Sequence, residues 1–596
     1  MIARWTEAWE RDQVRVSVLL VLVVALASSA TGLGNLFTYD DVPVIVENPM
    51  VTGLHTPWAY LTDSYWGPSR GNALYRPLTV IAFALEWALG RGSPFPFHLA
   101  NVVLYALTSL AVLALLRAVL PQGAALVAAL LWAAHPVHVE AVANVVGQSE
   151  MLAALPMLTA VTAYLLDRRA GALRARTVVL IAVCFPVALL TKEHGILLPA
   201  LLLAAEVAFR GQFLTAGTDG RARLWLLARI LMLEAAVYVA VRFLVLQGFA
   251  GDAPHQSLEG LSTGQRLWVM LALVPEFVRL FWWPAALFAD YSPLAVPVLP
   301  SPALGHLVGA AWLLLTAAVF AYAWRRDRLV AFALLWVGLA LGPISNIFVA
   351  TGVLVAERTL FLPSVGIALL AGRVFQRAWP PLMAFPKPWV RVAVPAVAFV
   401  VLVSAVAHSA DRQRVWADNA TLFTTTVVDA PTNFRAHYAL GELFGALGSH
   451  ERAEVHLRTA DTLFPGYDLI ELSLARVLHF EDRCAEALPL YDAVLSKRPD
   501  AEIAAIGRTA CLLESRRLSD ARDEALRGLG KGRSSGPFGL LLQKAESSLA
   551  ATDTVDARNR WFRAGGAVSK SNERLRVPVL FVRPSSTGVR RKTPES

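Results

Sequence analysis

Charged residues and cysteines are scarce in this sequence. Asp, Glu, Lys and Arg make up 17% of the 596 residues, and there are three cysteines. So few cysteines exclude a disulfide-dense framework. We expect Cys184, Cys484 and Cys511 to be small core residues, with a Cys484–Cys511 bridge as the open alternative.

The signatures of several enzyme classes are missing as well. The sequence has no glycine-rich nucleotide loop, no Walker motif, no Zn-type His/Cys spacing and no nucleophile elbow. The chemistries that depend on these motifs are therefore unsupported. The net charge is +9, and the positions of the charged residues along the chain are more informative than this total. We expect no nucleic-acid partner.

Long apolar runs, in contrast, are abundant. Hydrophobic residues make up 56% of the chain, and the mean hydropathy is +0.51. Many runs approach the ~20 residues that cross a bilayer as a helix. We predict a polytopic membrane protein with about eleven spans. The predicted spans are residues 16–34, 97–119, 122–136, 149–166, 176–191, 194–209, 224–247, 305–324, 329–348, 357–376 and 389–409.

Lys and Arg residues predict the orientation of these spans, because short cytoplasmic loops are rich in them. With eleven spans every basic cluster falls on the cytoplasmic side, the N-terminus included. Counting 266–284 as a twelfth span would place the cluster Arg325–Arg328 outside, so we predict that 266–284 is re-entrant or interfacial. The clusters are Arg4–Arg15, Arg168–Arg176, Arg210–Arg229, Arg325–Arg328 and Arg373–Arg391.

The first apolar run has a second interpretation. Its basic start and the sequence "ALASSA" resemble a signal peptide. We expect an uncleaved span, because the Asp-Asp segment that follows needs an anchored neighbour for the role considered below.

The predicted topology collects the polar residues of the membrane part on the outer face. Polar groups at span ends are costly unless they are paired or functional, so we expect a reaction centre at this surface. The outer loops are 35–96, 137–148, 191–195, 248–304 and 355–359.

The last part of the chain repeats every 34 residues. Pro431, Pro465 and Pro499 follow this step, and so do Ala453, Ala487 and Ala521. A 34-residue period with small residues and a closing proline is typical of tetratricopeptide (TPR) repeats, which stack into a solenoid that binds peptides or proteins. The alternative is a solenoid that only stabilises the membrane part or forms dimers.

We therefore predict three regions, all α-helical where they are ordered. Residues 1–415 form the membrane domain, and residues 416–565 form the TPR domain with three clear repeats and a degenerate fourth pair at 537–565. Residues 566–596 are basic and rich in Pro and Ser, which predicts a disordered tail.

Two adjacent carboxylates, Asp40 and Asp41, open the first outer loop. These carboxylates, together with Arg and Lys residues of the other outer loops, suit sugar transfer from a lipid-linked phosphate. A carboxylate can take the proton of an attacking hydroxyl, and Arg or Lys can stabilise the leaving phosphate. The alternative from residue types alone is that the two aspartates cap a helix or form a turn. Mg²⁺ would need further oxygen ligands, so we expect no essential metal.

The chain resembles the transmembrane and TPR-repeat-containing O-mannosyltransferases, within the GT-C class of polyprenyl-phosphate-dependent glycosyltransferases. The motifs come in the family's order and reach from residue 39 to beyond 440. They depart from it at "GQSE", where Gln148 and Glu150 replace a frequent basic residue and Asp, and the repeat array is short. The motifs are "YDDVPVIVENP", "YRPLTVIAFALEWALG", "FHLANVVLYAL", "HPVHVEAVANVVGQSEMLA", "TKEHGI", "VAERTLFLPSVG" and "WADNATLFTTTVVDAPTNFRAHYALG".

The resemblance implies roles for individual residues. Asp40 would be the catalytic base with Asp41 assisting, Arg358, Lys192 and Arg76 would bind the lipid phosphate, and other residues would line the acceptor or sugar side. Alternatives stay open: His135 could end a helix, and the pairs Lys192–Glu193 and Glu357–Arg358 could be local ion pairs. The further lining residues are His135, His138, Glu140, Glu150, Glu193 and Glu357.

The resulting prediction is an inverting GT-C enzyme. It would move a hexose, with mannose as the candidate, from a polyprenyl-phosphate carrier to Ser or Thr hydroxyls of exported proteins held by the TPR domain. The alternatives are a lipid or polysaccharide acceptor, or a non-catalytic scaffold that assembles partners through the TPR domain. Ala-, Val- and Arg-rich usage suggests a bacterial inner membrane with the TPR domain in the periplasm; in a eukaryote the membrane would be that of the endoplasmic reticulum.

Overall fold

The computed structural model describes residues 2–66, 74–210, 218–248, 258, 260–291, 302–347, 351–530 and 535–563. The chain divides into two compact units, residues 1–425 and 426–596. The described parts of both are built from helices joined by turns and loops, so the all-α prediction is confirmed there. The predicted disordered tail lies outside the described residues.

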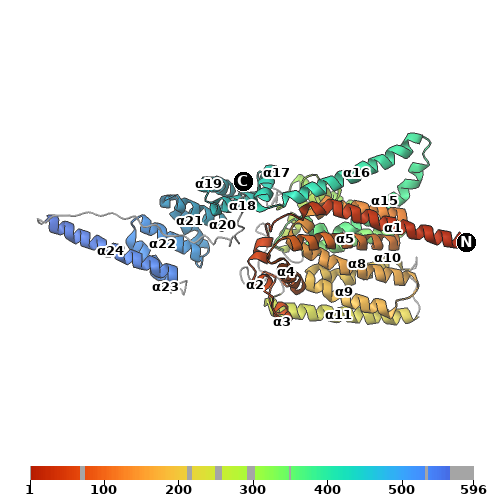
Figure 1. Ribbon diagram of the computed structural model, residues 1–596, viewed down its shortest axis with the longest axis horizontal. Coiled ribbons are helices and arrows are strands. Elements are labelled where there is room, and N and C mark those ends of the chain that lie inside the picture. The colour runs from red at the N-terminus through yellow and green to blue at the C-terminus, as the bar shows by residue number, and fades with distance from the viewer. Residues whose placement is uncertain are drawn as a thin grey trace, which may run out of the picture. The chain divides into compact units, whose positions relative to one another are not determined.

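The first unit is a bundle of long helices, several of which run alongside one another (Figure 1). Helices α1 and α5 pack together, as do α5 and α8, and α8 and α9. The long helices are α1 (Ile2–Ser29), α4 (Pro77–Gly90), α5 (Phe95–Val119), α6 (Gln122–Ala133), α8 (Gln148–Arg169), α9 (Ala175–Thr191), α10 (Leu198–Phe209), α11 (Thr218–Leu246), α12 (Thr263–Trp282), α13 (Leu304–Arg326), α14 (Arg328–Leu341), α15 (Pro363–Met383) and α16 (Pro388–Val415).

Six of the predicted spans coincide with helices long and apolar enough to cross a membrane. The predicted span 122–136 is instead the first half of a pair, Gln122–Ala133 and Pro136–Ala143, bent by 51°. The other predicted spans correspond to shorter or more polar helices, so the count of eleven stays a prediction. The six helices are Asp12–Gly32, Phe95–Val119, Val145–Arg169, Arg221–Leu246, Leu304–Arg326 and Trp389–Val415.

Small residues allow the helices of this bundle to approach closely. A Cβ atom added at Gly372 of α15 would lie 2.5 Å from Leu120 Cδ1 and 3.1 Å from Ala128 Cβ of α6. One added at Gly309 of α13 would lie 2.0 Å from the carbonyl oxygen of Leu271 in α12. Close packing of small residues is the usual way in which membrane helices associate.

Short helices connect the long ones, and α2 and α3 gather with α4 at the end of the bundle away from the start of α1 (Figure 1). These connections carry most of the polar motifs of the sequence. They are the π-helix η2 (Val42–Val46), α2 (Pro49–Thr52), α3 (Pro57–Leu61), η4 (Pro136–His138), α7 (Val139–Ala143), η5 (Val145–Gly147), η6 (Glu193–Leu197) and η9 (Glu357–Leu360).

The second unit repeats helical hairpins with the predicted 34-residue step. Ala453, Ala487 and Ala521, which share one position of the repeat, are fully buried. The expected fourth hairpin at 537–565 is wrong, because α24 (Ser535–Arg563) is one continuous helix. The hairpins are α18 (Phe434–Ala446) with α19 (His450–Leu463), α20 (Asp468–Phe480) with α21 (Cys484–Lys497), and α22 (Glu502–Glu514) with α23 (Leu518–Gly530).

Two of the cysteines do not behave as free core residues. Cys484 at the start of α21 is joined to Cys511 of α22 by a disulfide, whereas Cys184 is free and buried. The expectation of three free cysteines was wrong because it considered residue type alone. The hairpin repeat brings the first turn of one helix beside the next helix, which no spacing rule for cysteines expresses.

Candidate active site

Arg358 joins two carboxylates that are 100 residues apart in the chain. Its Nη2 lies 3.0 Å from Asp40 Oδ2, and its Nη1 lies 3.1 Å from Glu140 Oε1. The backbone N–H of Arg358 also donates to Glu140 Oε2 at 2.8 Å. Glu140 is buried, while the Asp40 and Arg358 side chains keep 19% and 18% of their surface exposed, so a substrate can reach them.

Asp41 has different partners from its neighbour. Its two oxygens accept from the backbone N–H groups of Thr38 at 3.1 Å and Val146 at 2.9 Å. Burial raises the pKa of Asp41 to about 7, although the hydrogen bonds from Thr38, Val146 and Val145 act to lower it. Asp41 thus ties the start of this loop to the residues just before the "GQSE" segment.

The backbone beside Asp40 is held in an uncommon conformation. Tyr39 has a φ of 52°, a region that non-glycine residues seldom occupy and that tends to occur at functional sites. Its N–H donates to Asn419 Oδ1 at 2.8 Å, and its ring meets Phe423 edge-on. The π-helix η2, a rare element also frequent at functional sites, begins at Val42.

The segment before Asp40 is attached along its length to residues 410–419. Thr31 Oγ1 donates to the carbonyl of Ala410 at 2.6 Å, and Leu36 N–H donates to that of Ala417 at 2.8 Å. Asn35 Nδ2 completes the set with a bond to a carbonyl of α16. We call these bonds, together with that of Tyr39, the loop anchor.

A second ion pair lies between Lys192 and Glu150, with His194 Nδ1 at 3.5 Å from the same carboxylate. Burial lowers the pKa of Lys192 to about 8, although the Glu150 charge raises it. Glu150 therefore has a basic partner. The open alternative of a Lys192–Glu193 pair is replaced by Lys192–Glu150.

Glu193 instead binds Arg76 through two nitrogens, at 2.9 Å from Nε and 2.7 Å from Nη2, and Arg242 approaches to 3.5 Å. Burial raises the pKa of Glu193, but the two guanidinium groups outweigh it and hold that pKa at about 2. The Arg76 guanidinium lies 4.9 Å from the ring centre of Tyr65. Tyr65 is buried, and its hydroxyl has no hydrogen-bond partner in the described parts of the chain.

The three groups form one electrostatic site. The charges of Arg76 and Arg358 both lower the pKa of Lys192, and those of Arg76, Asp40 and Arg358 all act on Tyr65. Residues from four of the predicted outer loops therefore lie together. The arrangement is a set of carboxylates and cations in alternation, suited to an anionic substrate that also has a hydroxyl to deprotonate.

The remaining predicted residues lie around this site with partners of their own. His135 accepts from Val137 N–H, as the residue before a helix does, and its Nε2 lies 3.1 Å from the carbonyl of Phe281. His138 is buried between Tyr105, at 3.1 Å, and Ser364, at 2.9 Å. These contacts give both histidines a structural role in the resting chain.

Glu357 is fully buried. Its Oε1 accepts from Phe288 N–H at 2.7 Å and from the Tyr291 hydroxyl at 2.8 Å, so it is bound separately from the neighbouring Arg358. Phe288 and Tyr291 belong to the remaining predicted outer loop, 248–304, so Glu357 connects this loop to the loop 355–359.

Three residues escaped the sequence reasoning. Arg242 lies in the predicted span 224–247, which also carries Arg229 and Glu234, and a charge within a span is itself a signal of function. Asn419 lies within the quoted motif "WADNATLF", but nothing in that motif indicates a bond to Tyr39. Tyr65 gave no signal, because an aromatic residue in a loop is common.

Two glycines of the motifs allow the loops to pack. A Cβ atom at Gly147 would lie 2.5 Å from the Ala141 carbonyl oxygen, and one at Gly195 would lie 2.5 Å from the Ala188 carbonyl carbon. Both contacts are to backbone, which cannot move aside easily. These glycines set the approach of the loops that carry Glu150 and Lys192.

The fold and the site together define an all-helical membrane protein with a TPR-type helical repeat and a charged site built from its loops. Comparison with known proteins agrees with this description. No family model matches the chain. The chain is similar over most of its length to protein O-mannosyl-transferases, which confirms the resemblance indicated by the motifs.

Mouse protein O-mannosyl-transferase TMTC3 is 26% identical over 587 residues, covering 86% of this chain and 63% of TMTC3. The Caenorhabditis elegans protein O-mannosyl-transferase F38B6.6 is 25% identical, covering 76% and 63%. Mouse TMTC1 reaches 41% identity over 135 residues, which are 22% of this chain and 14% of TMTC1. The chain thus spans slightly less than two thirds of the length of the first two relatives.

Among solved structures, the apo oligosaccharyltransferase of Archaeoglobus fulgidus aligns with a TM-score of 0.38 and 16% identity, over 67% of this chain and 56% of that one. An alignment at this score does not define the fold.

Proposed function

We propose that this chain is an inverting membrane glycosyltransferase of the GT-C class. It transfers a hexose, with mannose as the candidate, from a polyprenyl-phosphate carrier to Ser or Thr hydroxyls of exported proteins. The similarity to protein O-mannosyl-transferases supports the reaction class. The observation that carries the proposal is Arg358 placed between Asp40 and Glu140, with Lys192 and Arg76 close enough to share its electrostatic environment.

In the proposed reaction, Asp40 takes the proton of the acceptor hydroxyl while its oxygen attacks the anomeric carbon. The bond from that carbon to the phosphate oxygen breaks, and the electron pair leaves with the lipid phosphate. Attack from the face opposite the leaving group inverts the configuration. A positioned carboxylate base contributes about 10²–10⁴-fold to such a reaction, and Asp41 assists by holding the loop.

In this proposal the donor phosphate binds a cation that is paired with a carboxylate in the described structure. Arg358, Lys192 and Arg76 are bound to Asp40, Glu150 and Glu193 in the described structure. Both side chains are partly exposed in Asp40–Arg358 and in Arg76–Glu193, and of these two pairs the first includes the proposed base. A phosphate that draws Arg358 toward itself frees Asp40 as a base, so donor binding precedes proton transfer. No metal is required for these steps.

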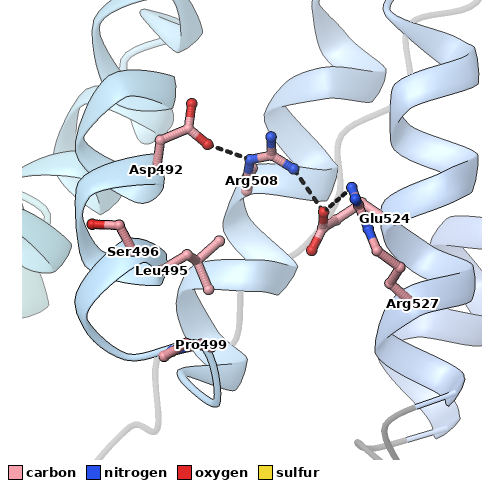
Figure 2. A pocket seen from close by; sticks show the side chains of 7 residues that line it. All are labelled: Asp492, Leu495, Ser496, Pro499, Arg508, Glu524 and Arg527. Atoms are coloured by element: carbon pink, nitrogen blue, oxygen red, sulfur yellow. Dashed lines mark hydrogen bonds and ion pairs between the residues drawn. The ribbon is translucent and has the colours of Figure 1, made fainter.

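The second unit holds the acceptor in this proposal. A cavity of about 320 Å³ lies between α21, α22 and α23 (Figure 2). Its central cation, Arg508, is bound to Asp492 at 2.6 Å and Glu524 at 2.7 Å, so a polypeptide would have to displace one of them. A lipid or polysaccharide acceptor therefore stays the second candidate. In this proposal the active face and this unit lie in the periplasm, and the N-terminus lies in the cytoplasm.

The test uses the purified chain in bilayer discs with polyprenyl-phosphate mannose or glucose and a pool of exported proteins. Wild type should transfer sugar from one of the donors. Asp40→Asn should lower kcat by about 10²–10⁴-fold and leave donor binding intact. Asp63→Asn is the matched control, because Asp63 lies in the same loop and bonds only the neighbouring Ser64 N–H in the described structure.

Transfer that persists in Asp40→Asn would place the base elsewhere, with Glu140 and Glu150 next. Absence of both transfer and donor binding in wild type would favour the scaffold. Mannose on a lipid fraction instead of protein would favour the second candidate acceptor.

A further inference from the structure

Four potential metal ligands converge in the second unit, at a place unrelated to the charged site of the first. His479, Cys484, Cys511 and Glu514 offer one ligand atom each, and these atoms all lie within 4.8 Å of one another. His479 closes α20, Cys484 opens α21, and Cys511 and Glu514 belong to the last turn of α22. Among the described residues, no other group of three or more His, Cys, Asp or Glu side chains converges in this way.

The distances suit a tetrahedral centre. His479 Nε2 lies 3.2 Å from Glu514 Oε2, and Cys484 Sγ lies 3.3 Å from the same oxygen. In a tetrahedral zinc site with bonds of about 2.0–2.3 Å, neighbouring ligand atoms are ~3.3–3.8 Å apart. The two sulfurs lie much closer than this, because they are joined as a disulfide. Opening that bond lets them separate to this spacing by side-chain rotation.

The surroundings also match those of a metal site. His479, Cys484 and Cys511 are buried and shielded from water, whereas Glu514 is partly exposed and closes the site on its solvent side. The other ring nitrogen of His479, Nδ1, lies 3.5 Å from the Tyr491 hydroxyl, the kind of neighbour that orients a metal-bound histidine. The ligands come in two close pairs, His479 with Cys484 and Cys511 with Glu514; because each pair mixes two ligand types, neither pair shows the Cys-Cys or His-His spacing of a zinc motif.

We propose that the reduced Cys484–Cys511 pair binds Zn²⁺ together with His479 and Glu514. The metal and the disulfide are then alternative cross-links between α21 and α22, and the metal also binds α20 through His479. A dithiol reductant opens the bridge by thiol exchange, taking the two sulfurs to thiols while it becomes a disulfide itself. Zn²⁺ binding then displaces the two thiol protons. A disulfide oxidant that exchanges with the pair takes two electrons, becomes a dithiol itself, re-forms the Cys484–Cys511 bridge and releases the metal.

The experiment uses the full chain in detergent, in the Cys184→Ala background so that the bridge holds the only remaining cysteines. One portion stays oxidised, and another is reduced and freed of reductant under anaerobic conditions. Each is equilibrated with ZnSO₄, desalted, and assayed for bound zinc per chain by mass spectrometry. Co²⁺ replaces Zn²⁺ in a parallel sample, because thiolate-to-cobalt absorption reports sulfur ligation directly.

The reduced chain should bind about one equivalent of zinc, and the oxidised chain should bind none. Cys484→Ser with Cys511→Ser should abolish binding, and His479→Gln should weaken it roughly tenfold or more. His456→Gln, in the same unit but outside the cluster, should leave it unchanged. The proposal would be overturned if the oxidised and reduced chains bound equal amounts of zinc, or if the reduced chain with all four ligands bound none. Both results are measured on a chain in which the four ligands are intact, so neither depends on whether a variant folds.

Discussion

Asp40 and Asp41 are adjacent in sequence, yet one faces a cation and the other faces backbone N–H groups. Asp40 can change partner when a phosphate arrives, because an ion pair that is partly exposed exchanges readily. Asp41 cannot, because two segments of backbone depend on it. We therefore expect substitutions at the two positions to differ in kind: Asp40 variants should lose transfer, and Asp41 variants should also lose stability.

Asp41→Asn should remove a pH dependence of stability. The pKa of Asp41 rises from 3.8 to about 7 on burial. Between about pH 4 and pH 7 the folded chain keeps a proton that the unfolded chain has released, so the free energy of unfolding falls as pH rises through this window, by ~4 kcal/mol at most. Above it the contribution is constant. Melting curves of wild type and Asp41→Asn in detergent from pH 4 to 8 test this prediction. If the melting temperatures of the two proteins change in parallel with pH, the prediction is wrong.

Tyr65 gives a second prediction at this scale. Because its buried hydroxyl lacks a partner in the described structure, Tyr65→Phe should leave the melting temperature unchanged or higher. Tyr65→Leu removes the ring beneath Arg76 and should cost about 1–2 kcal/mol. Thermal melting of the two variants tests this prediction. A lower melting temperature for Tyr65→Phe would mean that the hydroxyl makes a hydrogen bond. If Tyr65→Phe also loses transfer, the hydroxyl meets substrate.

At the scale of elements, the glycines of the short connecting helices determine how closely the loops approach. Gly147→Ala and Gly195→Ala should each cost about 1–3 kcal/mol, because the new methyl group meets backbone. Gly338→Ala in α14 is the matched control: nothing lies within 4 Å of its Cβ position, so the change should stabilise the helix by about 0.5–1 kcal/mol. Chemical unfolding in detergent measures all three, and equal effects would refute the packing argument.

The sequence predicted elements well where one period dominates. The 34-residue repeat predicted three hairpins whose helices begin at that step, and six apolar runs became helices of spanning length. The sequence did not predict the features that depend on contacts between elements. The disulfide and the single helix α24 depend on which helix faces which, and hydrophobic period does not encode that.

At the scale of the whole molecule, the charged site exists only because distant loops meet. Residue types and the family resemblance singled out Asp40, Lys192 and Arg358 as residues of one site, and the structure pairs Asp40 with Arg358, whose charge acts on Lys192. They could not give the pairing, because Lys192 could bond Glu193 next to it or Glu150 more than 40 residues away. Desolvation and backbone geometry decide between such partners, and both need coordinates.

A chain that ends at Asp429 tests the division of labour between the two units. It keeps α17 (Asn419–Asp429) and hence the bond from Tyr39 to Asn419, so the first unit should fold and bind donor. Transfer to a short Ser/Thr peptide should persist, while KM for a protein acceptor should rise about 10²-fold or more. Steady-state kinetics with both acceptors measures this. An unchanged KM would assign acceptor binding to the membrane unit.

The loop anchor has a mechanical consequence. Residues 410–419, which lead into the second unit, are hydrogen-bonded to the stretch that ends at Tyr39, one residue before Asp40. A displacement of residues 410–419 would therefore be transmitted through these hydrogen bonds to Tyr39, whose positive φ leaves its backbone little freedom to adjust, and from there to Asp40.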